Sequence, residues 1–125
     1  MNQILLVAAG GAVGSVCRYL VGVGLLRLAG SAFPWGTLAV NLVGSFGIGV
    51  LAELIVARFG ASPEMRLLLI TGFLGGFTTF SAFALDAVSL FERGAAVSSL
   101  VYVGASVGLS LVATVAGIGV MRSLL

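Results

Sequence analysis

The sequence contains no histidine and no lysine, and it has one cysteine and two prolines among its 125 residues. Without an imidazole, the chain cannot build a histidine metal site or activate a serine or cysteine nucleophile through histidine. A single cysteine allows no disulfide within the chain. Cys17 lies in an apolar stretch, which favours a small packing residue over a reactive thiol.

Charge is scarce as well. Charged residues make up 8% of the chain, hydrophobic residues make up 60%, and the formal net charge is +2. This composition is too apolar for a soluble domain and indicates an integral membrane protein, whose partner is the lipid bilayer. The net charge is too small to suggest a nucleic-acid partner. The opening stretch MNQILLVAAGG lacks a basic signal-peptide region, so we expect it to begin a retained membrane helix.

We expect one all-α domain, residues 1–125, with four transmembrane helices, because four apolar segments each reach the roughly 20 residues that a spanning helix needs. These segments cover about residues 3–26, 36–57, 63–91 and 96–121. Short connections rich in Gly, Ser and Pro separate them. Ser62, Pro63 and Glu64 favour a helix start, with a cap, a first-turn proline and an acid near the positive end of the helix dipole.

The third segment contains the run GFLGGFTTFSAF, residues 72–83, in which glycines and β-branched threonines weaken a helix. We predict a mid-membrane break at about residues 75–79. Such a break survives only where it is buried in protein or lines a cavity. Unwound backbone exposes carbonyl oxygens, which suit a hard cation such as Na⁺ better than zinc or copper.

Phe80 and Phe83 follow this break and, being three residues apart, share a helix face. Phenylalanines are most often core residues. The edge of an aromatic ring is nevertheless electropositive, so these rings could also line a path for a small anion.

Two further polar features have alternative interpretations. Asn41, in the second segment, either joins helices through its amide or offers hydrogen-bond donors to a ligand. The fourth segment carries Tyr102, Ser106, Ser110 and Thr114 at four-residue intervals, which places them on one helix face. A single hydroxyl can bond to its own helix. Four hydroxyl groups on the same helix face instead favour a hydrated or ion-lining surface.

The arginines give little preference for one orientation in the membrane. Arg58, Arg66 and Arg122 fall on the side of the N-terminus, and Arg27 and Arg93 fall on the other. Positive residues normally mark the cytoplasmic side. This near balance therefore favours insertion in both orientations.

The remaining charges have simpler interpretations. Arg18 either attracts anions into a vestibule or is an anchor that extends to the interface. We expect Glu53, Asp86 and Glu92, near helix ends, to be solvated or capping groups and not a proton relay.

Small residues within the segments predict close helix packing. They are Gly10 and Gly14 in the first segment, Gly44, Ser45 and Gly49 in the second, and Gly104 and Gly108 in the fourth.

Three motifs in order, GGAVGSVCRY, PWGTLAVNLVGSFGIG and TGFLGGFTTFSAF, resemble the CrcB/Fluc family of small bacterial fluoride channels. The resemblance covers essentially the whole chain, and the second and third motifs together are highly specific. It implies an antiparallel, dual-topology homodimer with two fluoride pathways. It also implies a structural sodium ion at the dimer centre, held by backbone carbonyls of the helix break.

The resemblance also implies roles for individual residues. The sodium carbonyls fall on Gly75 and Thr78, and Arg18 matches the arginine after the first glycine motif. The fluoride pathway falls on Asn41, Phe80, Phe83, Ser81, Ser110 and Thr114, with Tyr102 nearby. One departure is Ala82, where the family usually has a threonine, and this puts one hydroxyl contact along the pathway in doubt.

The expected function is passive export of fluoride across the bacterial inner membrane, with no reaction catalysed. An alternative is a small multidrug-type, proton-coupled exporter, which needs an intramembrane carboxylate. The first segment has none. A second alternative is a membrane assembly subunit that transports nothing, against which the polar face and the helix break argue.

Overall fold

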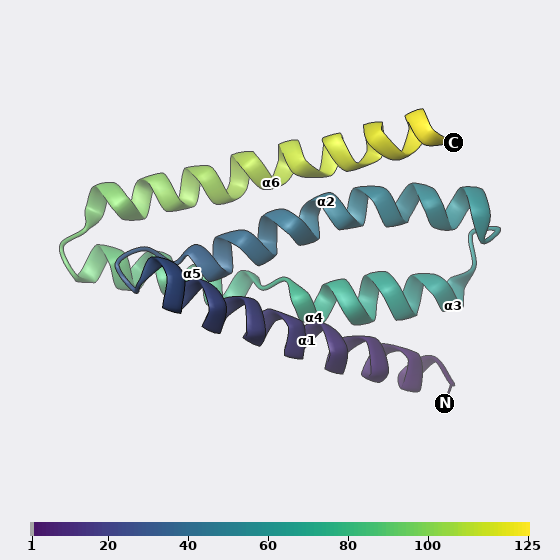
Figure 1. The fold of residues 1–125 in the computed structure, drawn as a ribbon, viewed down its shortest axis with the longest axis horizontal. Coiled ribbons are helices and arrows are strands. Elements are labelled where there is room, and N and C mark those ends of the chain that lie inside the picture. Colours follow the sequence, from purple (N-terminus) through teal and green to yellow (C-terminus); the bar gives the residue numbers. More distant parts are fainter. Residues whose placement is uncertain (1) are drawn as a thin grey trace.

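The computed structural model describes residues 2–125, which form four helical passes running back and forth (Figure 1). Helix α1 spans Asn2–Ala29, α2 spans Trp35–Arg58 and α6 spans Ala96–Leu124. The third pass comprises α3 (Pro63–Arg66), the π-helix η1 (Leu67–Leu74), α4 (Gly75–Phe77) and α5 (Phe80–Glu92). All four passes are long and apolar enough to cross a membrane, which confirms the expected all-helical, multi-pass class.

The helix boundaries follow local signals in the sequence. The Ser62 hydroxyl accepts a hydrogen bond from the Met65 amide at 3.3 Å, and Pro63 takes the first helical position, as expected. Helix α1 ends at Ala29, and Gly30 follows with φ +78°. This left-handed conformation favours glycine and ends a helix. Both described chain ends lie at the same end of the bundle, as an even number of passes requires (Figure 1).

Glycines set the closest helix contacts. A Cβ added to Gly14 on α1 would collide with the carbonyl of Phe73 on η1, and one added to Gly49 on α2 would collide with the backbone of α6. The backbones therefore touch at these points, as the glycine spacing predicts. Gly104 and Gly108 differ, because a Cβ at either would meet no atom of the described chain within 4 Å.

The core lies on the α5 side of the bundle. Leu38 of α2, Phe83 and Leu90 of α5 and Tyr102 of α6 form one buried cluster. Tyr102 has none of its surface exposed. This cluster fixes α5 against α2 and α6, close to the point where the third pass leaves helical geometry.

The non-helical segment of the third pass is shorter than the predicted break at residues 75–79. Gly75–Phe77 are helical, and only Thr78 (φ −91°, ψ 160°) and Thr79 (φ −154°, ψ 122°) are extended. The physical reason lies in packing, because a Cβ on Gly76 would collide with the carbonyl of Gly11 on α1. The glycines thus allow close approach to α1 and do not unwind the helix. The π-helix η1 was not anticipated.

Candidate functional site

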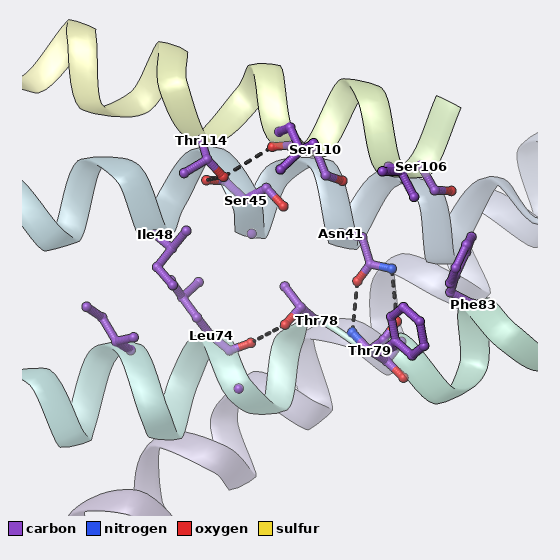
Figure 2. Close-up of a pocket in the computed structure, with 16 residues that line it drawn as sticks. Asn41, Ser45, Ile48, Leu74, Thr78, Thr79, Phe83, Ser106, Ser110 and Thr114 are labelled. Atoms are coloured by element: carbon purple, nitrogen blue, oxygen red, sulfur yellow. Dashed lines mark hydrogen bonds between the residues drawn. The ribbon is translucent and has the colours of Figure 1, made fainter. Parts of the chain in front are cut away.

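The side chain of Asn41 pairs with both backbone groups of Thr79 (Figure 2). Its Nδ2 donates to the Thr79 carbonyl at 2.9 Å, and its Oδ1 accepts from the Thr79 amide at 2.8 Å. This is the pattern of two bonds that a neighbouring strand would supply. The Asn41 side chain of α2 therefore takes the place of the helical hydrogen-bond partners that the extended residue Thr79 lacks.

The same contacts remove helical donors from two carbonyls. In a continuous α-helix, the amide of residue i+4 donates to the carbonyl of residue i. The Thr79 amide, which would serve Gly75, is bound to Asn41. The Ala82 amide, which would serve Thr78, donates to the Thr79 hydroxyl at 3.1 Å. The carbonyls of Gly75 and Thr78 thus lose their usual donors to side chains.

These groups face an open groove of about 440 Å³, which α2, the third pass and α6 enclose (Figure 2). The structure brings most of the residues singled out from the sequence to this groove. They are Asn41, Gly75, Thr78, Phe80, Phe83, Ser110 and Thr114.

The hydroxyls of α6 are only partly engaged. The Thr114 hydroxyl lies 2.9 Å from the Ser45 carbonyl and 3.1 Å from the Ser110 carbonyl, and it donates to them. Ser106 also lines the groove, and its buried Oγ has no hydrogen-bond partner among the described residues. Ser106 was not among the residues assigned to the pathway, although its place in the four-residue repeat of hydroxyls could have indicated it.

Phe80 and Phe83 form a tilted pair, with ring centroids 5.4 Å apart and an interplanar angle of 59°. Phe83 is buried and rests against Tyr102, whereas Phe80 is 77% exposed. One ring is therefore fixed by the core of this chain, while the other projects from it.

Three of the singled-out residues lie outside the groove lining. Ser81 is exposed, with its hydroxyl 3.3 Å from that of Thr79. Tyr102 lies behind Phe83, and its hydroxyl donates to Asp86 at 3.2 Å. Asp86 is half-buried in the middle of α5, so it is not a capping carboxylate, and its expected solvation stays a prediction.

The third is Arg18, whose Nε donates to the Gly76 carbonyl at 2.9 Å. Arg18 lines a second cavity of about 530 Å³ between α1 and α2, to which Thr37, Thr79 and Ala82 also contribute. Thr79 lies between the two cavities, since it lines both. Ala82 lines the second cavity, so a hydroxyl at this position would lie outside the groove.

A four-pass helical bundle with a groove lined by hydroxyl-bearing residues, aromatic residues and backbone that has lost helical donors is the kind of structure that small ion-conducting membrane proteins have. Comparison with known proteins identifies the family. A family model described as "CrcB-like protein, Camphor Resistance (CrcB)" matches residues 5–118, and the chain belongs to this family. The resemblance predicted from the three motifs is thereby confirmed.

Curated relatives match over the full length of the chain. The protein of Rhizobium johnstonii is 70% identical over 124 residues, which are 99% of both chains. That of Rhizobium meliloti is 64% identical over 124 residues, also 99% of both chains. That of Chelativorans sp. is 51% identical over 125 residues and 100% of both chains. Each carries the name "Fluoride-specific ion channel FluC".

Proposed function

We propose that this protein is a fluoride-specific channel of the bacterial inner membrane, which lets fluoride leave the cytoplasm passively and catalyses no reaction. One observation carries the proposal. Asn41, Phe80, Phe83, Ser110 and Thr114 line a single groove, in a chain whose family relatives are named fluoride-specific ion channels.

Fluoride is small and holds its hydration water strongly, so a selective path must replace that water at close range. The Asn41 amide has two N–H donors, and one of them binds Thr79. The other is the donor that we assign to the anion. The edges of Phe80 and Phe83 supply electropositive contacts without a full charge that would trap the ion. Ser110 and Thr114 continue this lining along α6, and the buried Ser106 hydroxyl joins them.

The working unit in this proposal is an antiparallel, dual-topology homodimer. A single chain leaves the groove open and Phe80 mostly exposed, and a Cβ added to Gly104 or Gly108 would meet no atom of the described residues within 4 Å. A second copy would supply the missing wall. Three arginines on one side against two on the other support insertion in both orientations.

Tags at the C-terminus test this arrangement, because both membrane faces should expose them in one population of active protein. A C-terminus on one face only, with flux intact, would exclude the antiparallel dimer.

We further propose that the carbonyls of Gly75 and Thr78 hold a structural Na⁺ where the third pass is interrupted within the membrane. Both carbonyls have lost helical donors and lie at the groove, which fits a hard cation bound by oxygen alone. Two chains would contribute four such oxygens. When bound, the ion would supply positive charge beside these carbonyls.

The deciding experiment is fluoride efflux from liposomes that contain the purified protein, with chloride as the control ion. Efflux of fluoride but not chloride, down its gradient and without a proton gradient, is expected. Efflux that requires an opposing proton gradient would instead support the proton-coupled exporter, with Asp86 as its intramembrane carboxylate.

A further inference from the structure

Arg18 is placed unusually for a residue that only attracts anions. It is partly buried in the middle of the bundle, and its Nε donates to the Gly76 carbonyl. A guanidinium inside the membrane is costly unless it pairs with other charges or with backbone carbonyls. The end of a helix also carries partial negative charge, which favours a cation there. Arg18 therefore binds the end of the helix formed by α4.

The carbonyl that Arg18 holds has a particular place in the chain. Gly76 is the neighbour of Gly75, and in a continuous helix its carbonyl would accept from the Phe80 amide. Arg18 occupies this carbonyl from α1, while Asn41 occupies the amide and carbonyl of Thr79 from α2. Side chains of two other helices thus bind three backbone groups. Two of these, the Gly76 carbonyl and the Thr79 amide, would otherwise pair across the interruption.

We propose that Arg18 is a positioning residue for the cation site: by holding the Gly76 carbonyl, it prevents helical pairing across Thr78 and Thr79 and so keeps the Gly75 and Thr78 carbonyls free. The inference rests on the sodium site proposed above. Arg18 itself binds neither the cation nor fluoride in this role. Along the chain, the Gly75 carbonyl would bind the cation, the Gly76 carbonyl accepts from Arg18, and the Thr78 carbonyl would bind the cation again.

The test measures Na⁺ binding without fluoride. Purified protein is heated at increasing Na⁺, with ionic strength kept constant by N-methyl-D-glucamine. Fitting the logarithmic rise in Tm gives the Na⁺ dissociation constant, which we call the midpoint. In Arg18→Met the Gly76 carbonyl is free to pair along the helix. The midpoint is then expected to rise by at least about tenfold, which corresponds to one lost charged hydrogen bond.

Two further variants control this measurement. Arg27→Met removes the same charge from an exposed position of α1 and should leave the midpoint unchanged. Arg18→Lys keeps the charge but loses the planar N–H at Nε, and should give an intermediate midpoint. If Arg18→Met does not form a monodisperse dimer, the Na⁺ midpoint of Arg18→Lys is compared with that of Arg27→Met, and a higher midpoint in Arg18→Lys supports the role of Arg18.

The outcomes separate this inference from the proposals on which it rests. A wild-type protein that Na⁺ does not stabilise would remove the sodium site, whatever Arg18 does. Wild-type stabilisation with the same or a lower midpoint in Arg18→Met and Arg18→Lys would overturn the role of Arg18. In that case, fluoride flux would show whether Arg18 only attracts anions. Arg18→Lys would then conduct better than Arg18→Met at low fluoride, and high ionic strength would remove this difference in flux.

Discussion

The two halves of the third pass meet their neighbours in different ways. Before Thr78, the backbone lies directly against α1, and Gly14 is needed because any Cβ would meet the carbonyl of Phe73. After Thr79, α5 is held by large side chains, with Phe83 packed on Tyr102 in the buried cluster. The first half is fixed by the absence of side chains and the second by their shape. Substitutions of the glycines that meet a neighbouring backbone should therefore affect folding, and substitutions of residues that line the groove should affect conduction.

The largest effect is expected for Gly14→Val, which places atoms where the backbone of η1 lies. Overpacking typically costs about 1–3 kcal/mol, and here the obstacle is a backbone carbonyl that cannot rotate away. We expect no monodisperse peak in size-exclusion chromatography. Gly24→Val is the matched control, since a Cβ there meets nothing within 4 Å. Equal behaviour of the two variants would mean that the backbones of α1 and η1 do not touch.

The second-largest effect is expected for Gly75→Leu, at the boundary between the two halves of the third pass. Within one chain the nearest atom to an added Cβ is the Ile70 carbonyl, at 3.7 Å, so a single chain has room for it. In the proposed dimer the side chain would crowd the sodium ion. We expect loss of fluoride flux and of stabilisation by Na⁺.

Gly119→Leu is the control for this variant, because a Cβ at Gly119 meets nothing within 4 Å, so a single chain has room for this side chain as well. Retained flux and Na⁺ stabilisation in Gly75→Leu would argue that no second chain approaches this point.

A smaller effect is expected for Phe80→Ile and Phe83→Ile. Apolar exchanges of similar size are usually tolerated as packing, so a packing role predicts normal flux. If ring edges replace water around fluoride, one lost contact of about 1.4 kcal/mol lowers occupancy roughly tenfold. We expect liposome flux to fall at least about tenfold while the size-exclusion profile is retained.

Phe73→Ile is the matched control from the first half of the pass. Phe73 stacks on Phe77, with centroids 5.8 Å apart, and is not among the residues that line the groove. Its flux should stay near that of the wild type. Normal flux in both Phe80→Ile and Phe83→Ile would show that the rings only pack.

These contrasts also explain what could be anticipated from the sequence. Four apolar segments and the Ser62 cap are local features, and each was found where it was expected. Asn41 and Thr79 are 38 positions apart in the sequence, so no local pattern predicts that they pair. For the same reason, glycines that pack against α1 were interpreted as breaking the helix. Ser106 had the right spacing, but only the structure shows that its hydroxyl is buried without a partner in the described chain.

The smallest effects are expected at Thr78, where the proposed ligand is the backbone carbonyl and not the side chain. The Thr78 hydroxyl donates to the Leu74 carbonyl at 2.8 Å, and its methyl group fills the space beside Gly44. Thr78→Ser keeps the hydroxyl bond and loses one methyl, which costs about 0.8 kcal/mol of stability. Thr78→Val keeps the shape and loses a bond worth about 1 kcal/mol. Because both keep the carbonyl, flux should fall less than about threefold in each, as measured by liposome efflux beside thermal unfolding. A severe loss of flux in Thr78→Val alone would instead assign the ion contact to the hydroxyl.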